Sequence, residues 1–469
     1  MYIGQPVRRK EDFRFLTGRG RYVADIKIPG AAHAAFVRSP HAHARIRSIS
    51  TSVAGKMPGV LRILTGADWK RENLGVSPVL WIVTSSDGKP MHSAARPILA
   101  TERVRFVGDT VALVIAATQE QAQSAAESID IDYDPLAATV TAEDSLRAGA
   151  PLVHEQFRTN MSFDWEIGNR DSTNAVFANA DHVTRLTLVN NRLAPCPLEP
   201  RAVIGNYDSA TDQYTLWSTT QNPHLVRNWL AEHSLFVPEH KMRVVAPDVG
   251  GGFGQKIYHY PEEPTVLWAS RLVGRPVRWT STRSENLMVD THARDHVTEC
   301  SLALDSNGMF LALQADTLAN LGAYMSPFAS CIPTYFYAPM LSELYKIPSI
   351  YCRVRGFYSH TTPIDAYRGA GRPEALLVVE RLIENAAHEL GIDPADIREK
   401  NFIQPDEFPY TTATMCKYDS GNYPGLMQKT KEMGNYEALR REQKQLREKG
   451  VILGIGISAF ADCAGATTE

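Results

Sequence analysis

The spacing of hydrophobic residues predicts helices in several parts of the chain. The clearest covers residues 375–390, where apolar side chains recur at steps of three and four and Gly391 follows. A second predicted helix runs from 262 to 273 and is stopped by Gly274. A third covers 118–128, with its first residue, a threonine, as the N-cap.

Short apolar runs between these helices predict strands. Residues 297–304 and 309–313 flank Asp305–Gly308, whose Asn-Gly pair favours a tight hairpin turn. The other predicted strands cover residues 35–38, 111–116, 183–189, 213–218, 242–247, 277–280, 351–358 and 451–458. The charged run 429–449 is typical of a solvated helix. Helices and strands are therefore mixed along the chain, which predicts an α+β protein.

The length of 469 residues predicts more than one domain. Residues 1–17 are charged and are interpreted as an extended lead-in, and residues 18–135 mix short strands and helices in a first α/β domain. Residues 136–160 are rich in alanine and weakly patterned, as in a linker. The second domain is expected over residues 161–469.

Charge and composition exclude several classes of function. The formal net charge of -3 argues against a nucleic-acid partner, which usually requires a basic surplus. No apolar run is long enough for a membrane span, and the first residues lack the pattern of a signal peptide, so a cytoplasmic location is expected.

Cysteine and histidine spacing gives no sign of a metal bound by this chain. The six cysteines are scattered without a CxxC pair, so neither an iron–sulfur cluster nor a structural zinc site is expected. His41 and His43 have no further ligands nearby in the sequence. His292 and His296 have the spacing of helical zinc ligands but lie in a segment that is expected to be loop and strand.

The most unusual stretch is the glycine loop, residues 249–256 (Val-Gly-Gly-Gly-Phe-Gly-Gln-Lys), between a predicted strand and a predicted helix. Its glycines let the backbone approach a ligand closely, and bare amides at such a turn suit an anion or an oxo group. The loop lacks the third glycine of a dinucleotide fingerprint, because Gln255 stands there, and its spacing differs from that of a P-loop.

Two further stretches accompany the glycine loop: residues 218–224 (Ser-Thr-Thr-Gln-Asn-Pro-His) and residues 365–373 (Asp-Ala-Tyr-Arg-Gly-Ala-Gly-Arg-Pro). Together the three resemble the motifs of the molybdenum hydroxylases, the xanthine oxidase and carbon monoxide dehydrogenase family. The similarity is to the molybdopterin-binding large subunit and extends from about residue 18 to residue 424. It implies a hammerhead-like α/β domain followed by the first molybdopterin-binding α+β domain.

The resemblance also implies roles for individual residues. Gln221 would hydrogen-bond an oxo group of the molybdenum, and Arg368 would lie at the substrate pocket or the cofactor loop. Both are candidate catalytic and cofactor-binding residues, and Gly251, Gly252, Phe253 and Gly254 complete the cofactor-binding set. Arg372 is interpreted as a possible partner of a carboxylate. Glu199-Pro200-Arg201 matches a turn of the family and is interpreted as a rigid structural turn. The aromatic residues 335–337 either line the substrate pocket or fill the core.

Two positions depart from particular family members. The cysteine that holds copper in carbon monoxide dehydrogenases is replaced by Gly369, which cannot bind a soft metal, so copper-dependent CO oxidation is not expected. The glutamate that contacts the ring in purine-oxidising members is replaced by Ile257, which disfavours xanthine.

The resemblance implies a molybdenum–molybdopterin cofactor, in the cytosine dinucleotide form, with 2Fe-2S clusters and FAD on partner subunits. Family subunits carry their catalytic base in a Gly-Glu motif, and this sequence contains no Gly-Glu dipeptide. We therefore expect a split subunit, as in nicotinate dehydrogenase, whose second half is a separate chain, or else a truncated gene product. The expected activity is oxidation of an N-heterocycle or an aldehyde with water as the oxygen source. The alternative is a non-catalytic homologue that acts as a scaffold or assembly partner.

Overall fold

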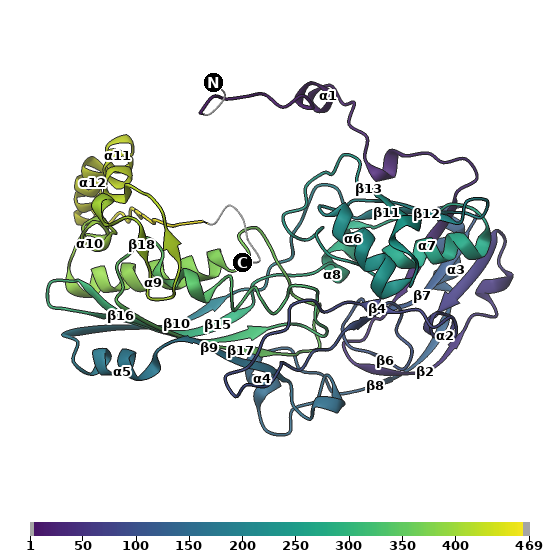
Figure 1. The fold of residues 1–469 in the computed structure, drawn as a ribbon, viewed down its shortest axis with the longest axis horizontal. Coiled ribbons are helices and arrows are strands. Elements are labelled where there is room, and N and C mark those ends of the chain that lie inside the picture. Colours follow the sequence, from purple (N-terminus) through teal and green to yellow (C-terminus); the bar gives the residue numbers. More distant parts are fainter. Residues whose placement is uncertain (1–3, 463–469) are drawn as a thin grey trace.

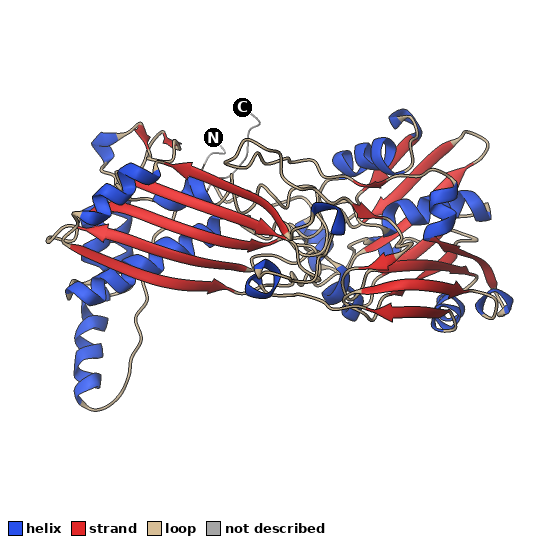
Figure 2. Ribbon diagram, turned by 90° about the horizontal axis from the view of Figure 1, so that it is seen from below, coloured by secondary structure: helices blue, strands red, loops and turns tan. Residues whose placement is uncertain are grey.

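A computed structural model describes residues 4–462. Two large β-sheets follow each other along the long axis of the molecule, and each is covered by helices (Figure 1, Figure 2). Helices and strands occur throughout the described chain, which confirms the α+β prediction.

The first sheet has seven strands in the order β13-β12-β11-β14-β1-β7-β3. Helix α7 packs on one face and helix α3 on the other. Along β7 the side chains of Leu113 and Ile115 join the core under α7, whereas Ala112 and Val114 join the core under α3. This alternation explains why β7 is buried along its whole length and appears in the sequence as a continuous apolar run. The elements are β1 Ala32–Arg38, β3 Val60–Thr65, β7 Thr110–Ala116, β11 Ala202–Asp208, β12 Gln213–Ser218, β13 Met242–Val245, β14 Val277–Thr280, α3 Gln119–Glu127 and α7 Glu262–Val273.

The second sheet has five strands in the order β10-β15-β16-β17-β9. Strands β15 and β16 form the predicted hairpin, and β16 and β17 run parallel. The long helix α9 packs against β10 and β15, and α5 packs against β16 and β17. The elements are β9 Met161–Gly168, β10 His182–Asn190, β15 His296–Leu304, β16 Phe310–Asn320, β17 Ser349–Phe357, α5 Arg170–Ala178 and α9 Arg372–Leu390.

Smaller elements surround the two sheets. A three-stranded sheet has the order β6-β2-β8, and two small ladders pair β4 with β5 and β18 with β19. The bounds are β2 Ala44–Ser50, β4 Val76–Ser77, β5 Arg96–Pro97, β6 Arg103–Val104, β8 Asp130–Pro135, β18 Tyr410–Thr411, β19 Lys417–Tyr418, α1 Asp12–Leu16, α2 Gly66–Arg71, α4 Ala142–Leu146, α6 Pro223–Trp229, α8 Arg283–Val289, α10 Pro394–Asn401, α11 Tyr423–Met433 and α12 Tyr436–Glu448.

The predicted helix ends agree with the structure. Helices α7 and α9 end at Gly274 and Gly391, which adopt the left-handed conformation with φ of 67° and 66°. Helix α3 begins after Thr118, whose hydroxyl accepts a hydrogen bond from the N–H of Gln121 at 3.2 Å.

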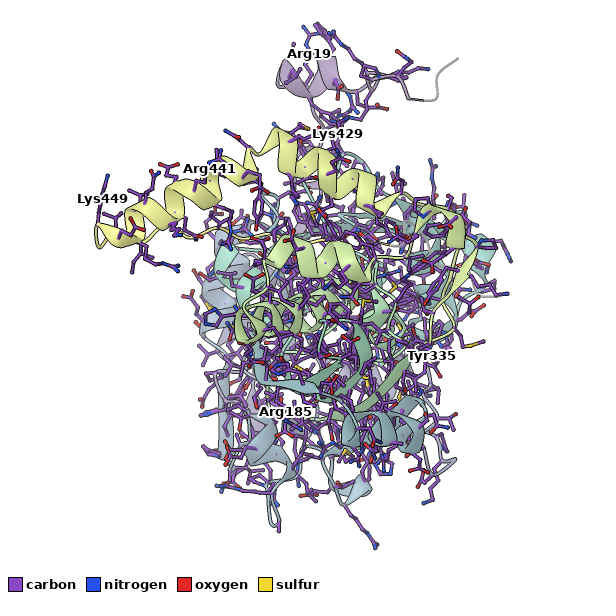
Figure 3. All side chains as sticks on the ribbon, turned by 90° about the vertical axis from the view of Figure 1, so that its left-hand side faces the viewer. Arg19, Arg185, Tyr335, Lys429, Arg441 and Lys449 are labelled. Atoms are coloured by element: carbon purple, nitrogen blue, oxygen red, sulfur yellow. The ribbon has the colours of Figure 1, made fainter. Side chains whose placement is uncertain are left out.

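The prediction of one solvated helix over residues 429–449 is wrong, because the segment belongs to two helices, α11 and α12. They are separated at Gly434 and Asn435, and Asn435 has a φ of 51° that no helix interior adopts. The solvated character is confirmed, since Lys429, Arg441 and Lys449 are exposed and point away from the body (Figure 3).

The strand predicted at residues 451–458 is also wrong. The segment has the alternating exposure of a strand but no β-ladder with any other described residue. A β-strand needs a neighbour to pair its backbone groups. Here the N–H groups of Ala459 and Ala461, just beyond the segment, instead donate to the carboxylates of Glu380 and Glu343, at 3.2 and 2.8 Å.

The expected lead-in and linker are more ordered than the sequence indicates. The lead-in contains α1, and its Arg14 forms an ion pair with Asp248; residues 1–3 lie outside the described part. The linker contains α4, and its Val153 and Asn160 are buried. The domain boundaries remain a prediction, and the seven-stranded sheet combines strands from both sides of residues 136–160. No helix among residues 4–462 is long and apolar enough to cross a membrane.

Candidate functional site

The glycine loop lies between β13 and α7, and its glycines are required by space as well as by conformation. Gly251 and Gly254 have φ of 91° and 102°. A Cβ at Gly254 would lie 2.5 Å from the carbonyl oxygen of Ala366, and a Cβ at Gly252 would lie 2.2 Å from Oε1 of Gln221. Two other segments therefore press directly against this loop.

Gln221 lies between β12 and α6 and is bound to the glycine loop at two points. Its side-chain Oε1 accepts a hydrogen bond from the N–H of Gly254 at 2.9 Å, and its backbone N–H donates to the carbonyl of Lys256 at 2.7 Å. The side chain is exposed, and no described residue accepts a hydrogen bond from its Nε2. Because Oε1 is already engaged, the group that Gln221 offers to a ligand is the Nε2 donor.

Arg368 lies on the loop between β17 and α9 and docks on the same turn. Its N–H donates to the carbonyl of Phe253 at 2.9 Å, and its own carbonyl accepts from Nη2 of Arg294 at 2.8 Å. Its side chain is exposed, as is Phe253. The structure thus brings Gln221, residues 251–254 and Arg368 together from three distant parts of the sequence.

No carboxylate among residues 4–462 pairs with Arg372. Its guanidinium lies over the ring of Phe336, 4.7 Å from the centroid, and donates to the carbonyl of Gly369 at 3.3 Å. Tyr337 is buried in the core, whereas Phe336 belongs to an apolar cluster next to the glycine loop. This cluster comprises Trp81, Ile257, Tyr258, Tyr260, Phe328, Cys331, Ile332, Phe336, Ala366 and Ala370.

Comparison with known proteins identifies the architecture. The family model of the molybdopterin cofactor-binding domain matches residues 153–402, and that of the aldehyde oxidase and xanthine dehydrogenase a/b hammerhead domain matches residues 17–137. The chain belongs to the molybdenum hydroxylase family. The predicted order, a hammerhead-like domain followed by a molybdopterin-binding domain, is thereby confirmed.

Individual relatives match nearly the whole chain. The carbon monoxide dehydrogenase large chain of Afipia carboxidovorans is 38% identical over 99% of this chain, and the nicotine 6-hydroxylase large subunit of Paenarthrobacter nicotinovorans is 33% identical over 99%. The crystal structure of quinoline 2-oxidoreductase from Pseudomonas putida 86 superposes with a TM-score of 0.89 at 36% identity, covering 96% of this chain and 56% of that one. The chain spans 58% and 56% of the lengths of the first two relatives.

An ionic network behind the glycine loop was missed by the sequence analysis. Arg201, which the sequence pattern indicates only as part of a rigid turn, contacts Glu262 at 2.9 Å and Asp290 at 2.7 Å. All three side chains are buried. Asp290 also accepts a hydrogen bond from Nε2 of Gln255 in the glycine loop at 2.7 Å. Sequence patterns mark buried apolar residues, but nothing in them shows that charged residues so far apart meet inside the protein.

The charges in this network shift one another's ionisation. Burial alone would raise the pKa of Glu262, but Arg201 and Arg38 hold it well below its usual range. Burial raises the pKa of Asp290, and this effect outweighs the opposite effect of the Arg201 guanidinium. Burial also raises the pKa of Asp365, which precedes the Arg368 loop, to about 6, although backbone N–H groups of Phe328 and Ala366 bind its carboxylate.

The donor groups fit a cofactor that brings its own metal ligands. No cluster of three or more His, Cys, Asp or Glu side chains that could hold a metal ion occurs within residues 4–462. His43 instead contacts the carbonyl of Ala137 at 2.8 Å, and His292 contacts that of Leu287 at 3.0 Å. The site offers exposed Nε2 and guanidinium donors beside a turn rich in glycine, which suits a polar, oxygen-rich ligand.

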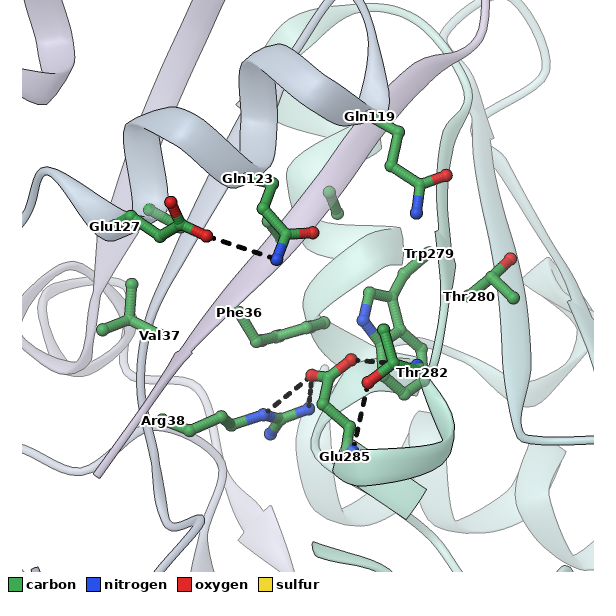
Figure 4. Close-up of a pocket in the computed structure, with 13 residues that line it drawn as sticks. Phe36, Val37, Arg38, Gln119, Gln123, Glu127, Trp279, Thr280, Thr282 and Glu285 are labelled. Atoms are coloured by element: carbon green, nitrogen blue, oxygen red, sulfur yellow. Dashed lines mark hydrogen bonds and ion pairs between the residues drawn. The ribbon is translucent and has the colours of Figure 1, made fainter. Parts of the chain in front are cut away.

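A separate cavity of about 320 Å³ lies between α3 and α8 (Figure 4). Its walls include Gln123, Trp279 and the ion pair of Arg38 with Glu285. None of the candidate residues at the glycine loop lines it, so the cavity is distinct from the candidate site.

Proposed function

We propose that this chain is the molybdenum-cofactor-binding part of a hydroxylase that oxidises a small organic molecule. The observation that carries the proposal is the hydrogen bond from the Gly254 N–H to Oε1 of Gln221, which engages the acceptor end of this amide and leaves its Nε2 donor for a ligand. When bound, the molybdenum–molybdopterin cofactor supplies a metal centre that takes up two electrons as an oxygen atom from water enters the substrate.

In this proposal the residues of this chain hold the cofactor and orient it and the substrate. The backbone of residues 251–254 would hold the cofactor, Gln221 would offer its Nε2 donor to it, and Arg368 would place a guanidinium beside the substrate or the cofactor. Fixed donors of this kind stabilise charge in a site from which water is excluded. The proposal assigns no residue of this sequence as the proton acceptor, because the sequence contains no Gly-Glu dipeptide.

The substrate we propose is an aromatic N-heterocycle, with an aldehyde as the second candidate. The apolar cluster with Phe336 and Ile257 beside the glycine loop suits a flat ring, and two of the relatives are named for quinoline and nicotine. Copper-dependent CO oxidation is disfavoured. A Cβ at Gly369 would lie 2.4 Å from the ring of Pro373, so a cysteine there would need a rearranged loop.

We further propose the cytosine dinucleotide form of the cofactor, and partner subunits that carry 2Fe-2S clusters and FAD and take the electrons onward. Relatives are large chains or large subunits, as their names state, and the small number of cysteines here leaves electron transfer to other chains. A cytoplasmic location remains a prediction from the sequence.

Two substitutions test the assignment. Gln221→Ala and Arg368→Met are expected to lower kcat/KM for the preferred heterocycle by about 10- to 100-fold, the usual cost of a lost hydrogen bond to a charged group. Gln428→Ala and Arg441→Met serve as matched controls, because both residues are exposed on α11 and α12. Wild-type turnover in Gln221→Ala and Arg368→Met would contradict the assignment. Turnover of aldehydes but not of heterocycles would exclude the first substrate class.

A further inference from the structure

Lys256, the last residue of the glycine loop, has a side chain that is fully buried. Its Nζ donates to the backbone carbonyl of Glu199 at 2.8 Å and to Oε2 of the Glu199 carboxylate at 3.0 Å. Burial lowers the pKa of Lys256, and the Glu199 carboxylate opposes that effect. A buried ammonium group is costly unless it is paired, so the lysine is held wherever Glu199 is held.

Glu199 is in turn bound to the other end of the loop. The same Oε2 accepts a hydrogen bond from the N–H of Gly250 at 2.7 Å, and the N–H of Glu199 donates to the carbonyl of Gly250 at 3.2 Å. A Cβ at Gly250 would lie only 2.5 Å from Cβ of Glu199. The glycine therefore permits an approach that any side chain would block.

The backbone of Lys256 completes the connection to the candidate site. Its carbonyl accepts hydrogen bonds from the N–H of Gln221 at 2.7 Å and from Oγ1 of Thr220 at 3.2 Å. Oε1 of Gln221 in turn accepts a hydrogen bond from the N–H of Gly254. One lysine thus connects Gly250, at the start of the loop, to Gln221.

We propose that the ion pair between the buried Lys256 and the largely buried Glu199 is a positioning device that fixes the glycine loop and, through it, the orientation of Gln221. Four glycines in five positions give the free loop a large conformational entropy. Contacts from outside the loop are therefore needed to hold its amides in one arrangement. Neither residue touches the cofactor in this scheme. The consequence for cofactor binding rests on the proposed function, whereas the ordering of the loop does not.

The test compares the intact protein, purified with its natural partners, with the single variant Lys256→Met and the double variant Glu199→Gln/Lys256→Met. The single variant leaves a carboxylate without its cation and is expected to unfold at a lower temperature. In the double variant no charge is left unpaired, and the amide oxygen of the new glutamine can still accept from Gly250, so thermal stability is expected to recover.

The decisive readout is backbone hydrogen exchange followed by mass spectrometry. In the double variant we expect exchange in residues 249–256 to accelerate by roughly tenfold or more, while residues 372–390 of α9 keep the wild-type rate. Unchanged exchange in the loop of the double variant would overturn the positioning role. Acceleration in α9 as well would also overturn it, since the pair would then support the fold as a whole.

Molybdenum content provides the second readout. We expect the double variant to retain molybdenum less well than the wild type during dialysis and to give an altered Mo(V) electron paramagnetic resonance spectrum. A wild-type protein without molybdenum would defeat the proposed function, and the exchange experiment would still decide the positioning role. A double variant with faster loop exchange but wild-type molybdenum retention and spectrum would overturn the link from the ion pair to the cofactor.

Discussion

Position 252 shows how a single missing side chain shapes the candidate site. Gly252 has no positive φ, so its conformation is open to other residues, but a Cβ there would collide with the end of the Gln221 side chain. The glycine is thus required for the contact between Gln221 and Gly254, and the requirement is one of space.

The variant Gly252→Ala should therefore displace the side chain of Gln221. We expect it to displace the Gln221 amide and to reduce turnover about as much as Gln221→Ala does, with little change in melting temperature, because a flexible side chain can move without unfolding the loop. Gly274→Ala is the contrasting control. It places a side chain in open space at a φ of 67°, so it should cost stability, by about 1 kcal/mol or more, and leave turnover intact. Wild-type activity in Gly252→Ala would show that Gln221 does not matter in its present position.

Asp365 predicts a component of stability that depends on pH. Its pKa is raised by burial to about 6 in the folded protein, against an ordinary value of 3.8. A raised carboxyl pKa means that the neutral form favours the folded state, so this contribution is complete below the ordinary pKa and is lost as the pH rises through about 6. The free energy of unfolding of the wild type relative to Asp365→Asn should fall by roughly 3 kcal/mol between pH about 4 and about 7. Urea denaturation across that range measures it, and a difference independent of pH would refute the assignment.

At the scale of elements, the N-terminus of α9 holds the Arg368 loop in place. Glu374 accepts the N–H of Gly371 at 2.9 Å and pairs with Arg294 at 2.8 Å, and Arg294 also donates to the carbonyl of Arg368. Both Glu374 and Arg294 are buried. One ion pair thus connects the segment before β15 to the helix that follows the candidate loop.

Removing Arg294 should destabilise the protein, because the buried carboxylate of Glu374 is then left without its cation. We expect Arg294→Met to lower the free energy of unfolding by about 3–5 kcal/mol, and the double variant Arg294→Met/Glu374→Gln to be more stable than Arg294→Met. Chemical denaturation of the two variants and the wild type gives the comparison. A double variant no more stable than the single one would mean that Arg294 acts through packing and not through its charge.

The sequence indicates most elements because their signals are local. Helix α9 and the hairpin of β15 and β16 follow from periodicity and from turn residues within a few positions. The segment 451–458 has the pattern of a strand, but a strand also requires a partner, and that depends on tertiary structure. The break at Gly434–Asn435 was missed because the run was interpreted from its charge alone, although its Gly-Asn pair is a local signal for the end of a helix.

The candidate site was predictable only in part, because contacts between distant residues leave no local signal in the sequence. Gln221, Phe253 and Arg368 were selected through a resemblance in sequence. In the structure the N–H of Arg368 donates to the carbonyl of Phe253, and the side chain of Gln221 accepts from the N–H of Gly254. Glu199 and Lys256 were not selected, because their importance lies in a pairing across more than fifty residues. The neighbouring residues in the sequence do not show that either charged side chain is removed from solvent.

At the scale of the molecule, the seven-stranded sheet joins the two parts of the chain. Strand β14, from the second part, lies between β11 and β1 and continues the sheet into the hammerhead region. Arg38 on β1 contacts Glu262 at the start of α7 at 2.7 Å, and Glu262 contacts Arg201. The glycine loop, which precedes α7, is thereby supported by both parts.

The most direct test of the central claim is the molybdenum content of the intact protein, purified under mild conditions from its native host with whatever chains accompany it. Elemental analysis and mass spectrometry of the released pterin should show molybdenum in proportion to the chain, together with molybdopterin. A Gln221→Ala preparation should contain less of both. A wild-type protein that carries neither molybdenum nor a pterin would contradict the account.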